Sequence, residues 1–382
     1  MSKLQVGVIA TSHKENELRL PIHPDHLRMF DDEIKNNIYF ERGYGARFGF
    51  NDNYLKKYCG GLLAREELFK KCDVILLLKP TVSDLKQFST GQVLWGWCHC
   101  VQGKEITQIG IDKKLTYIAL ENTNIWSKSG EKELHVFHRN SELAGYCGVY
   151  HSLQIMGLSG IYGKKRKAAI ICFGDTARGA IYALKGLGFN DITVFTRRPA
   201  QNVHHFVPGV RYARFQRLNA KCPEALCEDS RGGMVSMAKV LSEYGIIVNC
   251  ILQDTDAPLI FIRNSELKHL LRETLIIDIS CDSEMGFEFA RPTSFDEPTI
   301  NLGRGIIYYS VDHMPSLLWR AATHEISEAL LPYMKTVMRG KKAWERSNTI
   351  TKAIEICEGN IINSKILHFQ NRDHKYPHAF IR

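Results

Sequence analysis

The 382-residue sequence lacks the features of a membrane, secreted or zinc-binding protein. No apolar run reaches the roughly 18–20 residues that a membrane-spanning helix needs. The N-terminal stretch turns polar after a few apolar residues, which predicts a β-strand and not a signal peptide. Eleven cysteines without such a signal indicate free thiols. Cys98 and Cys100 flank His99, but no second Cys or His pair stands at zinc-finger spacing. We therefore expect a cytosolic protein without a metal site.

Acidic residues are fewer than basic ones, at 41 against 50, and the formal net charge is +9. Such an excess of positive charge can indicate nucleic-acid binding. Here the basic residues are scattered, and the one dense run, 164–167, directly precedes an apolar stretch and is expected to be a solvated loop. We therefore expect no nucleic-acid partner. The positive charge also suits an enzyme that holds a phosphorylated cofactor and a carboxylate substrate.

No internal repeat or low-complexity segment is visible, and the length favours two globular domains. Short apolar runs alternate with amphipathic stretches, which predicts an α/β fold with mostly parallel sheets. Asn140 or Ser141 is the expected N-cap of a long central helix, and residues 197–233 are expected to be irregular. The expected strands cover 4–10, 73–78, 92–97, 116–120, 168–173, 192–196, 246–252, 274–280 and 305–311. The expected helices cover 24–30, 63–71, 140–156, 177–187, 234–244, 265–271 and about 315–338.

A glycine-containing turn follows the apolar run 168–173 and precedes an expected helix. This order presents backbone N–H groups and a positive helix end to a pyrophosphate. Gly174 is expected to allow the turn and Gly179 to allow close helix–strand packing, while Thr176 replaces the usual middle glycine and offers a hydroxyl. A plain strand–helix turn is the alternative. The candidate cofactor-binding residues here are Gly174, Thr176, Ala177, Arg178 and Gly179.

The next expected strand ends in Thr196-Arg197-Arg198, where the adenosine ribose of a dinucleotide should lie. An NAD-binding protein usually places Asp or Glu there, for the ribose 2′-hydroxyl. No carboxylate is available here, whereas two guanidiniums and a hydroxyl suit a 2′-phosphate. The sequence therefore predicts an NADP(H) site.

Several short motifs resemble the alanine dehydrogenase and transhydrogenase-like group and, within it, the carboxyethylornithine synthases. Their order and spacing cover nearly the whole chain. The motifs are Glu17–Pro21, Gly96–Gly103, Arg139–Gly145, Ile277–Asp282 and Val311–Ser316. The resemblance implies a Rossmann-type NADP-binding domain over 141–312. It also implies a discontinuous α/β substrate domain, formed by 1–140 and 313–382.

The same resemblance implies a set of site residues. Arg19 and Lys79 would hold the carboxylate and carbonyl of a 2-oxo acid, His99 would act as acid and base, and Asp282 would face the reacting carbon. Glu142 and His313 are further candidates for substrate binding. One departure is that Pro80 follows Lys79 directly, without the family's intervening acidic residue.

The residue types fit these tasks. Arg19 can bind a carboxylate with two parallel hydrogen bonds, and an imidazole such as His99 carries protons near neutral pH. Asp282 follows an expected buried strand, at the edge of the sheet where α/β proteins bind ligands. There are structural alternatives: a core histidine for His99, a surface ion pair for Arg19, a helix cap for Glu142, and a turn before Pro315 for His313.

The expected activity is NADPH-dependent condensation of a 2-oxo acid with an amine. The resemblance implies pyruvate and the side-chain amine of ornithine or lysine. One alternative is an amino-acid dehydrogenase that uses free ammonia, which would be expected to prefer NAD. Another is a catalytically silent NADPH-binding regulatory protein. A homo-oligomer is expected for this architecture.

Overall fold

A computed structural model describes residues 3–199, 205–219, 222–228 and 233–381. The chain divides into two compact units: unit 1 is Met1–His138 with Leu318–Arg382, and unit 2 is Arg139–Leu317. The sequence predicts domain boundaries after residues 140 and 312, and the chain passes between the units after residues 138 and 317. Among the described helices, none is both long and apolar enough to cross a membrane.

Unit 1 is built on an eight-stranded sheet with the order β21-β20-β6-β5-β4-β1-β2-β3. The six strands from β3 to β6 are parallel, and β20 and β21 extend the sheet in antiparallel fashion. The central strands are buried, as is typical of parallel sheets. The strands are β1 (Val6–Val8), β2 (Ile38–Glu41), β3 (Gly61–Leu63), β4 (Val74–Leu76), β5 (Val93–Gly96), β6 (Thr116–Ala119), β20 (Ile354–Cys357) and β21 (Asn360–Ile361). A separate hairpin pairs β7 (Asn124–Trp126) with β8 (Lys132–His135).

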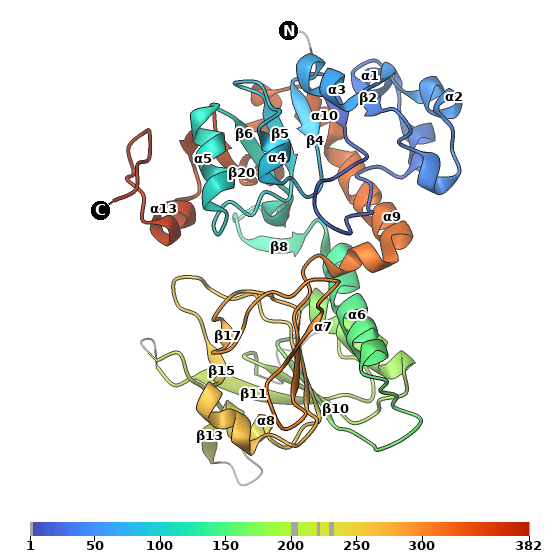
Figure 1. The fold of residues 1–382 in the computed structure, drawn as a ribbon. Coiled ribbons are helices and arrows are strands. Elements are labelled where there is room, and N and C mark those ends of the chain that lie inside the picture. Colours follow the sequence, from blue (N-terminus) through green and yellow to red (C-terminus); the bar gives the residue numbers. More distant parts are fainter. Residues whose placement is uncertain (1–2, 200–204, 220–221, 229–232, 382) are drawn as a thin grey trace. The chain divides into compact units, whose positions relative to one another are not determined.

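The helices of unit 1 include elements from both ends of the chain, and Figure 1 shows the orange and red α9, α10 and α13 among the blue and cyan elements. The long helix expected after Pro315 is broken, because Pro332 has no N–H group to continue the helical hydrogen bonds. The helices are η1 (Pro24–Met29), α1 (Asp32–Lys35), η2 (Ala46–Phe48), α2 (Asp52–Leu55), η3 (Lys56–Tyr58), α3 (Arg65–Lys71), α4 (Val82–Leu85), α5 (Lys104–Asp112), η4 (Leu120–Asn122), α9 (Trp319–Leu330), η8 (Leu331–Tyr333), α10 (Met334–Met338), α11 (Lys341–Trp344), α12 (Asn348–Thr351) and α13 (Ser364–Gln370).

Unit 2 is built on a nine-stranded sheet with the order β13-β12-β11-β10-β9-β14-β16-β19-β18. The six strands from β11 to β19 are parallel. The stretch expected to be irregular contains β11 and β12. The strands are β9 (Ala168–Ile171), β10 (Ile192–Thr196), β11 (Arg211–Arg217), β12 (Ala225–Glu228), β13 (Met234–Ser236), β14 (Ile246–Asn249), β16 (Leu275–Asp278), β18 (Thr299–Asn301) and β19 (Ile307–Tyr309); β15 (Ile260–Ile262) pairs separately with β17 (Gly286–Phe287).

The helices of unit 2 cover this sheet. Helix α6 begins at His138, so Asn140 and Ser141 lie inside it, and the N-cap expected there is wrong. The segment expected to be helical over 265–271 forms a 3₁₀ helix, and the one over 234–244 begins as a strand. The helices are α6 (His138–Ile155), α7 (Asp175–Gly186), α8 (Met237–Leu241), η6 (Asn264–His269) and η7 (Met314–Leu318).

Both units share one strand order. Numbered along the chain, the parallel strands of each run 3-2-1-4-5-6, from β3 to β6 in unit 1 and from β11 to β19 in unit 2. In this doubly wound arrangement the connections reverse direction beside the first strand, and ligands bind at the carboxyl ends of the strands around that point. The α/β, two-domain, Rossmann-type fold predicted from the sequence is confirmed.

Candidate active site

Lys79 and His99 lie together at the carboxyl edge of the sheet of unit 1. Lys79 follows β4 and His99 follows β5, and these two strands are parallel neighbours. The Lys79 Nζ and His99 Nε2 atoms are 2.9 Å apart. The two nitrogens are within hydrogen-bonding distance, so that a proton can pass between the two side chains. The side chain of His99 is exposed, which does not fit a histidine of the core.

Glu121 holds the backbone that presents His99. The His99 backbone is left-handed, with φ 47°. Glu121 follows β6, and its carboxylate accepts hydrogen bonds from the N–H groups of Cys98, at 3.2 Å, and of His99, at 2.5 Å. Burial, followed by the nearby Glu355 carboxylate, raises the pKa of Glu121 to about 8. Glu121 is not among the site residues predicted from the sequence. The sequence indicates it only by a carboxylate placed directly after an apolar strand. That strand, β6, pairs with β5, which precedes His99.

A second buried carboxyl group stands behind Glu121. Glu355 lies on β20, and burial raises its pKa as well. Its Oε1 atom accepts hydrogen bonds from the side-chain amides of Asn122 and of Asn363, the latter at 3.1 Å. Two neighbouring carboxyl groups with raised pKa values favour one protonated group over two negative charges. The loop that carries His99 is therefore anchored on a pair of acidic groups that holds at least one proton near neutral pH.

Arg19 is buried together with Glu17. The guanidinium donates to both Glu17 oxygens, with the Nε–Oε1 distance at 2.8 Å, and the Arg19 backbone N–H also donates to Glu17 Oε1 at 3.0 Å. The guanidinium carbon lies 5.3 Å from the centre of the Trp97 ring. The surface ion pair considered as an alternative for Arg19 is therefore wrong, because this pair is buried. Glu17 and Trp97 instead fix the guanidinium plane.

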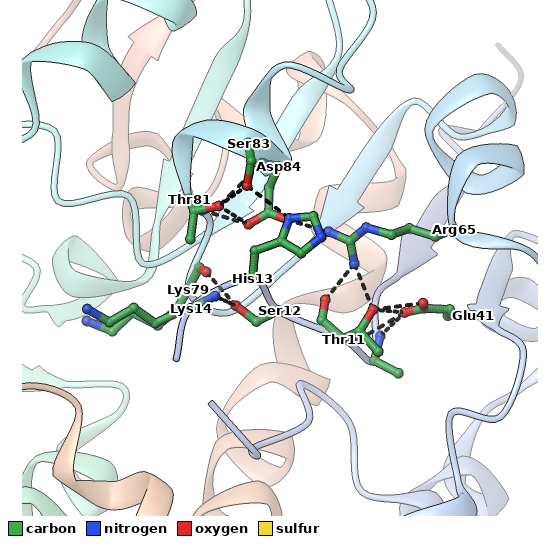
Figure 2. A network of polar contacts seen from close by, with 11 residues as sticks. Thr11, Ser12, His13, Lys14, Glu41, Arg65, Lys79, Thr81, Ser83 and Asp84 are labelled. Atoms are coloured by element: carbon green, nitrogen blue, oxygen red, sulfur yellow. Dashed lines mark hydrogen bonds and ion pairs between the residues drawn. The ribbon is translucent and has the colours of Figure 1, made fainter. Parts of the chain in front are cut away.

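The loop after β1 supports Lys79 from behind (Figure 2). Ser12 Oγ donates a hydrogen bond to the Lys79 carbonyl at 2.9 Å. Thr11 is held in turn by Glu41, at the end of β2, through its N–H group at 3.0 Å and its hydroxyl at 2.8 Å. Arg65 donates to the Thr11 hydroxyl at 2.9 Å. The ends of β1, β2 and β4 are thus tied together at the reversal point of the sheet. The same network includes His13, Thr81, Ser83 and the buried Asp84.

The glycine turn of unit 2 differs in detail from the expectation. Gly174 caps α7 with extended backbone, φ −120°, and the left-handed residue of the turn is Cys172, φ 79°. Gly174 is therefore not needed for the turn itself. A Cβ atom at Gly174 would meet no heavy atom within 4 Å, so space is open at the N-terminus of α7. Backbone N–H groups and the positive end of a 12-residue helix border this space, which fits a pyrophosphate.

The second glycine of the turn packs against a helix and not against the strand. A Cβ atom at Gly179 would lie 1.8 Å from the Glu142 carbonyl oxygen on α6. Reciprocally, a Cβ atom at Gly145 would lie 1.8 Å from the carbonyl oxygen of Thr176 on α7. Two glycines therefore let α6 and α7 cross with their backbones in contact. Ala177 is fully buried beside this crossing.

Three arginines surround the turn and the end of β10. Arg198 Nη2 donates to the Phe173 carbonyl at 2.7 Å, and the Arg178 guanidinium lies 4.5 Å from the centre of the Phe173 ring. Arg197 is exposed, and Thr196, the last residue of β10, is buried. Because β10 pairs in parallel with β9, these residues share the sheet edge with the glycine turn. This positively charged edge fits a 2′-phosphate.

Two carboxylates meet at the same edge further along. Asp282 follows β16 and Asp312 follows β19, and these strands are parallel neighbours. Burial, followed by the Asp312 charge, raises the pKa of Asp282. His313 has left-handed backbone, φ 45°, and its ring centre lies 5.2 Å from that of Phe295. The backbone N–H group of His313 donates to Asp312 Oδ1 at 2.7 Å.

Glu142 does not cap its helix. It is the fifth residue of α6 and forms an ion pair with Arg139 at 3.3 Å. The helix-cap alternative considered for it is therefore wrong. Of the candidate residues, Arg19, Lys79 and His99 lie in unit 1, whereas the glycine turn, the arginines, Glu142, Asp282 and His313 lie in unit 2.

A fully buried carboxyl group ends β16. Asp278 accepts hydrogen bonds from Asn249 Nδ2 at 3.0 Å, from the Tyr308 hydroxyl at 2.9 Å and from the Ser280 N–H at 3.1 Å. Burial raises its pKa to about 7, although these hydrogen bonds lower it. Asp278 thus braces β14, β16 and β19 directly below the Asp282 turn.

Family comparisons agree with this arrangement. The N-terminal domain of the alanine dehydrogenase/PNT family matches residues 7–144, and its C-terminal domain matches residues 144–364. The chain belongs to the alanine dehydrogenase/PNT family. It is therefore a member of a family of NAD(P)-dependent oxidoreductases that act on CH–NH groups.

Relatives within this family are similar over most of their length. The chain is 28% identical to N(5)-(carboxyethyl)ornithine synthase of Clostridium botulinum, over 85% of this chain and 92% of the relative. It is 21% identical to alanine dehydrogenase 1 of Staphylococcus aureus, over 95% and 96%. The fold is similar to a solved L-alanine dehydrogenase, with a TM-score of 0.75 at 18% identity over 96% of this chain and 99% of that one. It is also similar to a transhydrogenase from Sinorhizobium meliloti, with a TM-score of 0.69 at 14% identity over 94% and 98%.

Proposed function

We propose that this family member uses NADPH to condense a 2-oxo acid, pyruvate, with the side-chain amine of ornithine or lysine. The observation that carries the proposal is the 2.9 Å contact between Lys79 Nζ and His99 Nε2 at the carboxyl edge of the sheet. A cation beside a proton-carrying imidazole is the combination that carbonyl condensation requires. The similarity to N(5)-(carboxyethyl)ornithine synthases supports the choice of amine.

In this proposal unit 1 binds the 2-oxo acid. Arg19 pairs with the substrate carboxylate, and Glu17 and Trp97 keep the guanidinium from turning away. Lys79 donates a hydrogen bond to the keto oxygen and makes the carbonyl carbon more electrophilic. Holding both ends of the molecule orients the carbonyl for attack by the amine, which lowers the entropic cost of the condensation.

His99 would move the proton that this condensation requires. Amine attack gives a carbinolamine, and its hydroxyl leaves as water only when it is protonated. His99, within hydrogen-bonding distance of Lys79, would supply this proton. Glu121 acts as a positioning residue, because its two backbone hydrogen bonds hold His99 in its left-handed conformation.

Unit 2 would hold the cofactor. Gly174, Thr176, Ala177, Arg178 and Gly179 would form the pyrophosphate-binding turn, and Thr196, Arg197 and Arg198 would bind the adenosine ribose and its 2′-phosphate. When bound, NADPH supplies the hydride. From the family resemblance, Asp282 is the candidate for the carboxylate that acts on the reacting group, and Glu142 and His313 are further candidates for substrate binding.

A panel of amines tests the proposal. The protein is incubated with NADPH, pyruvate and one of ornithine, lysine, alanine or ammonium, and the loss of NADPH absorbance is followed. We expect turnover with ornithine or lysine and a product whose mass corresponds to reductive condensation. Turnover with ammonium alone would indicate a simple amino-acid dehydrogenase. NADPH binding without turnover for any amine would indicate a regulatory protein.

Variants of His99 test the acid–base role. Removing a general acid typically costs about a hundred- to ten-thousand-fold in rate. His99→Ala and His99→Gln should both lose turnover on this scale while keeping their NADPH affinity. Glu121→Gln keeps the shape but replaces one acceptor with an amide donor, so we expect a smaller rate loss and a shifted pH profile. If both His99 variants turn over like the parent, the assignment is wrong.

A further inference from the structure

Three histidines and a glutamate gather on unit 1, outside the residues assigned above. The ring centres of His23 and His26 are 5.3 Å apart, those of His23 and His324 are 5.6 Å apart, and those of His26 and His324 are 4.6 Å apart. One possible ligand atom each of His26, His324 and Glu328 lies within 4.8 Å of the other two. Imidazole and carboxylate groups at this density are the donor set of transition-metal sites.

Two regular elements of the same unit place these side chains on facing surfaces. His23 caps the 3₁₀ helix η1 and His26 lies three residues later, and residues at this spacing share a face because a 3₁₀ helix has about three residues per turn. His324 and Glu328 are four residues apart on α9, which places them on one face of an α-helix. Each element thus presents two donors.

Buried hydrogen bonds fix the two elements against each other. The Leu20 N–H donates to Thr323 Oγ1 on α9 at 2.9 Å, and Thr323 is fully buried. His26 Nδ1 and Ser327 Oγ, also on α9, are 2.8 Å apart. These contacts hold η1 firmly against α9, which keeps the buried His26 beside the part of α9 that carries the exposed His324.

Hydrogen bonds of His26 and His23 select the ring nitrogen of each that can bind an ion. Nδ1 of His26 is taken by Ser327, and Nδ1 of His23 accepts the Asp25 N–H at 3.2 Å. Nε2 of each ring is then the atom that can bind a metal. A metal-binding histidine usually has its other nitrogen hydrogen-bonded in this way, which fixes the tautomer and the ring orientation.

We propose that His26, His324 and Glu328, whose donor atoms lie within 4.8 Å of one another, bind a divalent ion of the zinc class, such as Zn²⁺, Co²⁺ or Ni²⁺, and that the neighbouring His23 ring turns toward the ion as a fourth ligand. Tetrahedral zinc with ligand distances of about 2.0–2.2 Å requires donor atoms roughly 3.3–3.5 Å apart. The side chains of His324 and Glu328 are 47% and 58% exposed, so both can rotate to close the remaining gap. Imidazole ligands exclude Mg²⁺ and Ca²⁺, which prefer oxygen.

Such an ion would act as a clip within unit 1. It would join η1, which follows the Arg19 segment directly, to α9 from the returning C-terminal segment. Because it would bind the folded state and not the unfolded chain, the ion should raise the melting temperature. The site does not depend on the proposed activity, and it explains why three imidazoles are packed together.

The test is a titration with Co²⁺ of protein first treated with a chelator. We expect saturable binding of one ion per chain, a visible d–d absorption band without the intense charge-transfer band of thiolate ligands, and a higher melting temperature. Mg²⁺ should produce none of these. His324→Ala and Glu328→Gln alter exposed side chains and should fold normally, yet each should lose at least about tenfold in Co²⁺ affinity.

His269→Ala is the matched control, because His269 is an exposed histidine at the end of η6 in unit 2. It should bind Co²⁺ like the parent. Unchanged affinity in both cluster variants would overturn the proposal, since the ion would then bind elsewhere. A thiolate charge-transfer band, or no saturable binding at micromolar concentrations, would also overturn it.

Discussion

Replacing glycines on helix α7 tests how unit 2 holds its cofactor turn. Gly179→Ala places a methyl carbon 1.8 Å from the Glu142 carbonyl oxygen, whereas ordinary contacts begin at 3.4 Å. The two backbones must separate by about 1.6 Å to accommodate it. Overpacking of a core costs about 1–3 kcal/mol and occasionally more. Because backbone and not a flexible side chain opposes this methyl group, we expect a loss of about 3 kcal/mol, a large part of the roughly 5–15 kcal/mol that stabilises a domain.

The same helix provides two controls. Gly186 is the last residue of α7 and an added Cβ atom there meets nothing within 4 Å, so Gly186→Ala should gain about 0.5 kcal/mol from the better helix propensity of alanine. Gly174 has open space and extended backbone, so Gly174→Ala should leave the free energy of unfolding within about 0.5 kcal/mol. Its methyl group would enter the proposed phosphate site and should weaken NADPH binding several-fold.

Urea unfolding followed by circular dichroism measures all three variants, together with the NADPH affinity from fluorescence. A change in midpoint at constant slope indicates a change in stability and not in the denatured state. The reasoning is refuted if Gly179→Ala stays within about 1 kcal/mol of the parent, because the helix crossing would then tolerate a methyl group.

Three further predictions follow from the site. NADPH should be used at least about tenfold better than NADH, and replacing Arg197 and Arg198 with Ala should remove most of that preference, which initial rates with both cofactors measure. Arg19→Ala should raise the Michaelis constant for pyruvate while leaving NADPH affinity nearly unchanged, and Arg19→Lys should recover only part, because an ammonium lacks the planar set of donors that can hold Glu17 and a substrate carboxylate together. The raised pKa of Asp278, about 7, means that stability present below about pH 4 is lost as the pH rises through 7. In the parent, the free energy of unfolding should fall between about pH 5.5 and 8, and Asp278→Asn should remove about 2 kcal/mol of that fall, as measured by urea unfolding at each pH.

The sequence predicted the central strands of both sheets because each is a short, continuous apolar run between turns. It did not predict β2, β3, β11 or β12. Tyr39 and Glu41 interrupt the apolar run of β2. Three of the seven residues of β11 are arginines, and only Phe215 of that strand is fully buried. Interrupted apolar runs give no clear strand signal in the sequence, and the pairing of these strands with distant segments shows only in the tertiary structure.

The site was predicted in part for a similar reason. His99 and Lys79 each follow a recognisable strand, and their contact follows from parallel pairing, which the sequence allows one to expect. Glu121 has no motif, because its role consists of two backbone hydrogen bonds. For the glycine turn, the sequence shows the motif but not what the motif contacts. Its pattern was visible, but the partner of Gly179 is a helix whose position only the tertiary structure shows.

The returning C-terminal segment has a consequence for the order in which the chain folds during synthesis. Strand β20 pairs with β6 at the edge of the first sheet, and the Ala119 N–H donates to the Ala353 carbonyl at 2.8 Å. Until residues 354–357 have left the ribosome, β6 presents an unpaired edge, which is a site for aggregation. Unit 2 is continuous in sequence and is complete before that point. We therefore expect unit 2 to fold before unit 1 is complete, although most of unit 1 is synthesised earlier. Truncation before β20 should then leave a folded unit 2 attached to an incomplete, aggregation-prone unit 1.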